Sequence, residues 1–202
     1  MKSIILSVSP QEAVNVLNGK ATMLLRKRVP KGFKGWCNLY VNKDYKFWDW
    51  FSKAGLFEYD AEFGKCCGSI PCRFWWDECV FTTTSNFDCI KEIPIAIPLE
   101  KIIDKTFLTR DKIADYECSG NKDDENKAEM FGIYAIHIKN LEIFDKPKAL
   151  GEFTRYGSEI RTIKDLENIT LSSEEVEKYV NQRRLTNAPK NYIYVCLAGD
   201  NG

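Results

Sequence analysis

Thr22, Arg26 and Arg28 stand at even spacing in the stretch TMLLRKR, and Lys20 stands just before it. Because side chains alternate along a β-strand, residues 22, 24, 26 and 28 would project from one face. A hydroxyl and two guanidinium groups on one face can donate hydrogen bonds to phosphate or another anion. The sequence therefore predicts an anion-binding strand face. The alternative, which the pattern alone favours, is a solvated basic edge strand.

The overall charge gives no support to nucleic-acid binding, because Lys+Arg 29 balances Asp+Glu 29. Residues 20–34, in contrast, contain six lysines and arginines and no acidic residue. Such one-signed runs are usually just solvated. Any nucleic-acid binding would therefore depend on this local basic run rather than on a global field.

A short helix is predicted immediately before the basic strand. Ser9 suits the N-cap of this helix, and Pro10 suits its first helical position. Glu12, three residues after Ser9, can pair with Ser9 in a capping box. Gly19 suits the left-handed residue that ends a helix. The predicted order is thus strand, capped helix, glycine stop and second strand.

Three stretches resemble the ASCH family, whose fold is PUA-like. They are LSVSPQEAVNVLNGKATMLLRKR at 6–28, YAIHIKNLEIFDKPKAL at 134–150 and NAPKNYIYV at 187–195. The first matches a family pattern of Ser-Pro, an apolar helix, Gly-x-Lys-Thr and an arginine-bearing strand. Ser9, Pro10, Gly19, Thr22 and Arg26 carry that match.

The resemblance implies an α+β fold: a small mixed PUA-like β-barrel with an N-terminal helix packed on it and further helices at the periphery. One domain would span residues 1–202. The implied function is binding of RNA or a nucleotide-like ligand in a basic cleft between the first helix and the barrel, with Trp36 or Tyr192 stacking on a base. The expected ligand-binding residues are Ser9, Lys20, Thr22, Arg26, Arg28, His137, Lys190 and Tyr192.

The alternative is a hydrolase acting on nucleosides or RNA, an amidohydrolase or ribonuclease of the same family. Family amidohydrolases use a lysine and a threonine from this strand, and the matching positions here are Ala21 and Leu24. Neither side chain can act as acid, base or nucleophile. An enzyme would have to use Lys20 as nucleophile or base. Its acid would come from among Asp77, Glu78 and Asp111.

Alternation and turn residues predict the remaining elements. Strands are expected at 36–41, 69–80, 131–143 and 192–197, helices at 44–54, from Thr109 and from 172 to 184, and a turn at 145–147. An aromatic-rich insertion is expected at 42–65 and a charged loop at 121–129. Phe47, Trp48 and Phe51 form an apolar stripe that is expected to pack in a core. The alternatives are a base-stacking platform and a protein-binding surface through Phe47, Trp48 and Trp50.

The cysteine and histidine content gives little room for other chemistry. Cys66, Cys67, Cys72 and Cys79 lack the paired spacing of zinc ligands, so they are interpreted as buried, reduced thiols. His137 is the only histidine, and no nucleophile, P-loop or dinucleotide-binding motif is present. We therefore expect no metal and no cofactor.

The chain is expected to be cytoplasmic and without membrane contact. Its first residues, MKSIILSVSP, have an apolar run too short for a signal peptide, and no segment approaches the length of a transmembrane helix.

Overall fold

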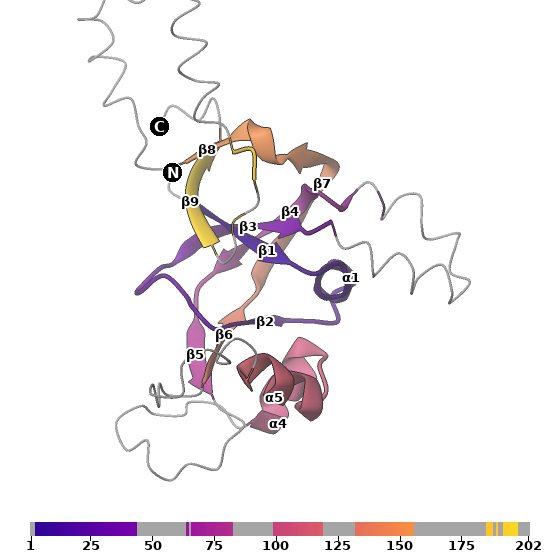
Figure 1. The fold of residues 1–202 in the computed structure, drawn as a ribbon, viewed down its shortest axis with the longest axis vertical. Helices are drawn as coiled ribbons and strands as arrows, with labels where there is room; N and C mark the ends of the chain where they lie inside the picture. Colours follow the sequence, from indigo (N-terminus) through magenta and orange to yellow (C-terminus); the bar gives the residue numbers. More distant parts are fainter. Residues whose placement is uncertain are drawn as a thin grey trace, which may run out of the picture. The chain divides into compact units, whose positions relative to one another are not determined.

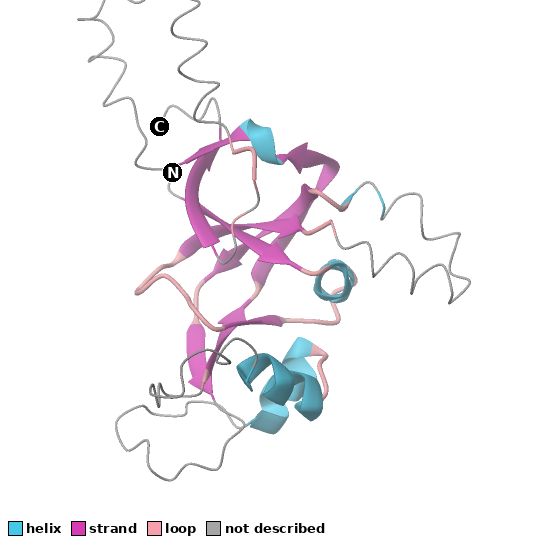
Figure 2. Ribbon diagram, in the orientation of Figure 1, coloured by secondary structure: helices cyan, strands magenta, loops and turns pink. Residues whose placement is uncertain are grey.

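The computed structural model describes residues 3–43, 64, 66–82, 99–118, 132–155, 185–187, 189 and 192–197. Within this part of the chain the fold is a mixed α+β arrangement in which strands predominate (Figure 2). The α+β class expected from the sequence is thereby confirmed. The chain divides into two compact units, residues 1–10, 35–74 and 142–202, and residues 11–34 and 75–141.

The first unit holds most of a six-stranded sheet with the order β7-β4-β3-β1-β9-β8. Its strands are β1 (Ser3–Val8), β3 (Gly35–Val41), β4 (Ser69–Trp76), β7 (Lys139–Ala149), β8 (Phe153–Arg155) and β9 (Tyr192–Leu197). A single 3-10 turn, η2 (Leu150–Glu152), joins β7 to β8. β1 is parallel to β3 and antiparallel to β9, and the predicted strands 36–41 and 192–197 are confirmed.

The centre of this sheet is buried on both faces. One face of β3 carries Cys37, Leu39 and Val41, which are fully buried as predicted. On the other face, Tyr40 joins an apolar cluster with Ile5, Ile70, Leu150, Phe153, Leu185 and Val195. Such two-sided burial is typical of a central strand.

The second unit is built on a three-stranded antiparallel sheet with the order β2-β6-β5. The strands are β2 (Met23–Arg26), β5 (Cys79–Thr82) and β6 (Ile133–His137), and the helices are α1 (Pro10–Leu17), α4 (Leu99–Thr106) and α5 (Arg110–Cys118). α4 packs against β2 (Figure 1). Met23, Leu25, Val80, Leu99, Ile102, Ile113, Ile133 and Ala135 form its apolar core.

Local signals placed two helix ends in this unit correctly. α1 begins at Pro10, directly after Ser9, and Gly19 beyond its end has φ +68°. Thr109 Oγ1 accepts a hydrogen bond from the Lys112 N–H (3.4 Å), so Thr109 caps α5 as expected. α4 itself was not predicted.

Three predicted elements are wrong. The strand expected at 69–80 is two strands in different sheets, β4 and β5, because the chain breaks at Asp77 and Glu78. The strand expected at 131–143 is likewise divided between β6 and β7, which belong to different sheets. The turn expected at 145–147 lies inside β7. β7 is an outer strand in the order of its sheet. Proline is tolerated in an outer strand, because one side of that strand has no neighbouring strand that would need a proline N–H.

Several predictions fall outside the described residues. These are the helices at 44–54 and 172–184, nearly all of the insertion at 42–65 with Phe47, Trp48 and Trp50, the loop at 121–129, and Lys190. The single domain and the barrel stay predictions. No helix in the described ranges combines the length and the apolar character needed to span a bilayer.

Candidate functional site

β2 does not present its basic residues as one solvent-facing row. Met23, Leu24, Leu25 and Arg26 are all buried, although β2 is an outer strand of its sheet. Thr22 and Arg28, which flank the strand, are exposed. Arg26 is therefore covered while Thr22 and Arg28 are not, and the anion-binding face expected from these three residues stays a prediction.

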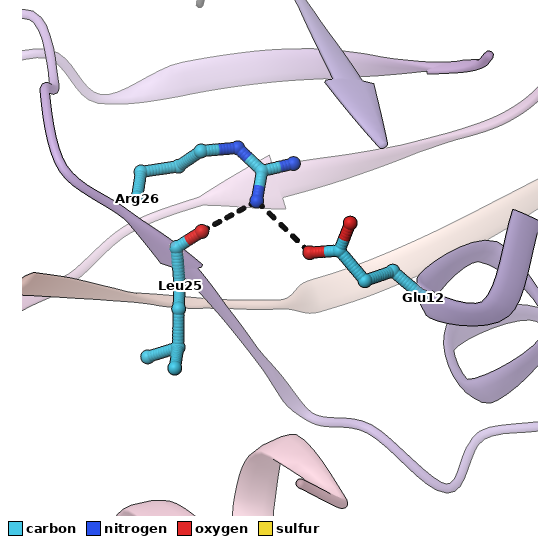
Figure 3. A network of polar contacts seen from close by, with 3 residues as sticks. All are labelled: Glu12, Leu25 and Arg26. Atoms are coloured by element: carbon cyan, nitrogen blue, oxygen red, sulfur yellow. Dashed lines mark hydrogen bonds and ion pairs between the residues drawn. The ribbon is translucent and has the colours of Figure 1, made fainter. Parts of the chain in front are cut away.

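Arg26 connects β2 to α1 (Figure 3). Its Nη1 lies 3.1 Å from Glu12 Oε1 and also donates a hydrogen bond to the Leu25 carbonyl. The side chains of Arg26 and Glu12 are 8% and 27% exposed. A guanidinium held in this way already has an anionic partner. The predicted contact of Arg26 with a ligand phosphate stays a prediction.

Close to this ion pair, the second unit has a small hollow. Its volume of about 10 Å³ leaves room for roughly one water molecule. It is lined by Glu12, Ala21, Met23, Leu24, Leu25, Thr106 and Leu108. This hollow is too small for a nucleobase.

Backbone hydrogen bonds join α4, β2, β6 and β5 in one row at an end of the three-stranded sheet. The Thr22 N–H donates to the Lys105 carbonyl (2.7 Å), and the Thr22 carbonyl accepts from the Ile138 N–H (2.9 Å). The His137 N–H donates to the Glu78 carbonyl (3.0 Å). In the strand register, Met23 is opposite His137, and Cys79 is opposite Ile136. The start of β2, the end of β6 and the start of β5 therefore meet.

Asp77 joins two basic side chains at this end. Its Oδ1 lies 2.7 Å from His137 Nδ1, and its Oδ2 lies 3.3 Å from Lys139 Nζ. The hydrogen bond from His137, and then that from Lys139, lowers the pKa of Asp77, against an opposing effect of desolvation. An ionised carboxylate only accepts hydrogen bonds, so Nδ1 of His137 carries the proton of this bond. Nε2 is then the acceptor nitrogen of the neutral ring.

Lys20 and Phe107 flank the same end of the sheet. Lys20 is exposed, and its Nζ lies 5.3 Å from the centre of the Phe107 ring. Phe107 follows the last residue of α4 and is 56% exposed. We call Lys20, Thr22, Asp77, Phe107, His137 and Lys139 the sheet-end site.

Three of the predicted ligand residues, Lys20, Thr22 and His137, thus belong to the sheet-end site. Sequence reasoning missed Lys139 as a partner of Asp77 and missed Phe107 altogether. The charged pair Asp77-Glu78 was the available signal, because aspartate and glutamate are depleted in strands and mark the break between β4 and β5.

The other predicted ligand residues lie in the first unit or away from this end. Ser9 is half-buried next to the start of α1. Tyr192 is half-buried on β9, with its ring edge-to-face on Tyr194 at 6.1 Å. The ring of Trp36 lies 4.2 Å beneath the Arg73 guanidinium, which is ion-paired with Glu142 (2.7 Å). The predicted roles of these residues stay predictions.

Five cysteines are free thiols: Cys37, Cys66, Cys67, Cys72 and Cys79. Burial raises the pKa of Cys67 to about 11, of Cys72 to about 12 and of Cys79 to about 11. Cys66 and Cys67 belong to a helical turn before β4 rather than to a strand. Across the described ranges no group of three or more potential ligands is arranged to hold a metal ion.

Comparison with known proteins gives similarity at the level of structure alone. No protein-family model and no curated protein sequence matches the chain. The structure is similar to the crystal structure of ASCH from Zymomonas mobilis, at 14% identity and a TM-score of 0.44, over 88% of this chain and 93% of that one. A point mutant of that protein gives 13% identity and a TM-score of 0.45, over 89% and 97% of the two chains.

Proposed function

We propose that this chain binds RNA or a nucleotide-like ligand at the sheet-end site, within a PUA-like fold of the ASCH type. One observation carries the proposal: a continuous row of backbone hydrogen bonds brings Lys20, Thr22 and His137 to one end of a sheet, beside Lys139. These residues come from separate segments, and three of them were predicted as ligand contacts. The sequence resemblance supports the fold and the class of ligand.

The charges at this end suit a polyanion of low charge density better than a compact multivalent anion. Lys20 and Lys139 are exposed, and His137 adds a half-exposed imidazole. Asp77 contacts both His137 and Lys139 and offsets part of the positive charge of Lys139. A phosphodiester backbone carries one charge per nucleotide, so it can contact Lys20 and Lys139 without crowding Asp77.

The test is a salt titration of RNA binding. Fluorescence anisotropy would measure the Kd of a labelled 12-nucleotide single-stranded RNA for the wild type, Lys20→Ala and Lys139→Ala. Each variant is expected to bind about 3- to 10-fold more weakly and to reduce the slope of log K against log salt by about 0.7, the value for one lost contact to a single strand. Lys101→Ala is the control, because Lys101 is an exposed lysine near the start of α4.

Arg28→Ala separates this site from the cleft that the sequence predicted beside the first helix. Arg28 is exposed beyond the other end of β2. We expect its removal to leave the salt slope unchanged. A reduced slope in Arg28→Ala, with no change in Lys20→Ala and Lys139→Ala, would contradict the sheet-end site. Absence of RNA binding by the wild type would contradict the function itself.

The hydrolase alternative is favoured by one contact, the 2.7 Å pair of Asp77 and His137. A histidine held at Nδ1 by a carboxylate can use Nε2 as a general base. In this reading His137, rather than Lys20, removes the proton from the attacking hydroxyl. Incubation of modified nucleosides and a short RNA with the wild type and His137→Gln decides the question: turnover that is lost in His137→Gln supports a hydrolase.

A further inference from the structure

Phe107 combines two features that a folded chain usually avoids. Its backbone has φ +57°, in the left-handed region, and its side chain is 56% exposed. Its N–H donates to the Ile103 carbonyl (3.0 Å), so Phe107 ends α4. Glycine is the usual residue at such a helix end, because it adopts positive φ without a clash of its Cβ. A bulky side chain there is strained.

Among the described residues, the neighbours of Phe107 offer little compensation for this strain. Its neighbour Leu108 packs against the apolar core, and Thr106 before it is buried, whereas the Phe107 ring is directed away from that core. The ring lies against the exposed cation of Lys20. A cation and a ring at an exposed site attract each other only weakly, because water screens the interaction. Strained residues that persist in this way cluster at ligand-binding sites.

We infer that Phe107 is a stacking platform for an unpaired base, so that the sheet-end site selects single-stranded RNA. The inference rests on the proposed function. Each base has a π-face that can stack on an exposed aromatic ring, whatever its identity. Lys20, next to the ring, is placed to contact the phosphate of the nucleotide that stacks.

Selection for single strands follows from this contact. In a duplex both faces of each base are covered by neighbouring base pairs, and RNA-binding proteins stack aromatic rings on bases that are splayed out of a helix. A duplex can still contact Lys20 and Lys139 through its phosphates. The ring therefore adds affinity for single strands alone.

The experiment compares Phe107→Gly, Phe107→Trp and the wild type with the 12-nucleotide RNA and with the duplex of the same sequence. Phe107→Gly is expected to weaken single-strand binding about 5- to 100-fold, the loss of one stacked base, while the salt slope stays that of the wild type. Duplex binding is expected to be unchanged. Phe107→Trp is expected to retain binding, because the indole also stacks.

Stability measurements distinguish a lost contact from a damaged fold. The Tm of Phe107→Gly is expected to equal or exceed that of the wild type, because glycine removes the strain at positive φ. Ile143→Ala is the control for an exposed large apolar side chain, since Ile143 is 59% exposed on β7. We expect Ile143→Ala to bind RNA as the wild type does.

The outcomes separate this inference from the proposed function. If the wild type binds single-stranded RNA and Phe107→Gly binds it equally well, the inference is overturned and the proposed function stands. Equal affinity of the wild type for the single strand and the duplex also overturns the inference. If the wild type binds neither RNA, the proposed function is overturned and the inference with it.

Discussion

Nη1 of Arg26 lies 3.1 Å from Oε1 of Glu12, so a buried guanidinium on β2 is neutralised by a carboxylate from the first turn of α1. The two residues were predicted to do other things: Arg26 to bind phosphate, and Glu12 to complete a capping box. Their pairing connects the helix to the strand within the second unit. It also explains how an arginine is accommodated on a strand that is covered on both faces.

Removal of the carboxylate charge at Glu12 is expected to lower the free energy of unfolding. Because the Arg26 side chain is only 8% exposed, it would be left as a poorly compensated charge. Glu12 is itself 27% exposed, so water reaches the pair and moderates the loss. We expect Glu12→Gln to cost about 1–3 kcal/mol, measured by urea unfolding.

The exposed ion pair of Arg73 and Glu142 is the matched comparison. Its atoms are closer, at 2.7 Å, but the side chains are 30% and 45% exposed. Surface pairs contribute roughly 0–1 kcal/mol, so Glu142→Gln should cost less than Glu12→Gln. If Glu142→Gln lowered the free energy of unfolding as much as Glu12→Gln or more, burial would not explain the stabilisation by the Glu12–Arg26 pair.

Asp77 should make stability depend on pH in the acid range. Its hydrogen bonds lower its pKa below the ordinary value of 3.8 in the folded chain. The unfolded chain then binds a proton at a higher pH than the folded chain does, so the stabilisation is present above about pH 4 and is lost as pH falls through the folded pKa. Urea midpoints of the wild type and Asp77→Asn should differ at pH 6 and converge as the pH falls below the ordinary pKa of an aspartate. A constant difference down to the lowest pH would contradict the ionised form of Asp77 as the stabilising species.

The thiols with raised pKa values should react slowly with alkylating reagents. Raising the pKa of Cys67 from 9.0 to about 11 reduces its thiolate fraction at pH 8 about 100-fold. Iodoacetamide should therefore modify Cys67, Cys72 and Cys79 at least about 100-fold more slowly in the native protein than in urea. Peptide mapping by mass spectrometry would give each rate. Rapid modification of Cys67 in the native state would instead indicate a reactive thiol.

Local sequence signals predicted the elements whose ends are set by interactions between residues close together in the chain. The first helix, its glycine stop, the Thr109 cap and the strand at 192–197 each depend on residues within a few positions of one another. Alternation also places Ile70, Cys72, Phe74 and Trp76 on one face of β4, and all four are buried. In these elements propensity and burial agree, so the sequence was sufficient.

The sheet-end site could not be predicted in full, because its contacts join segments far apart in the chain. Asp77 and His137 are 60 positions apart, and they meet only because the strand expected at 69–80 breaks between two sheets. Alternation cannot say whether a strand face meets solvent or another element. The burial of Arg26 by α1 was therefore missed, and with it the partner of Glu12.

Gly132, directly before β6, is expected to tolerate no side chain. A Cβ there would overlap the ring of Phe81, which packs edge-to-face on Tyr134 at 5.2 Å. Overpacking of this kind costs about 1–3 kcal/mol, so Gly132→Ala should lower the urea midpoint. Gly151→Ala is the control, because no atom lies within 4 Å of its added Cβ, and it should change stability by less than about 0.5 kcal/mol.

The overlap at Gly132 is with the ring of Phe81, so the double variant Phe81→Leu with Gly132→Ala should be less destabilised than the sum of the two single variants. Simple additivity in that double-mutant cycle would mean that the cost of Gly132→Ala arises from the backbone and not from contact with Phe81.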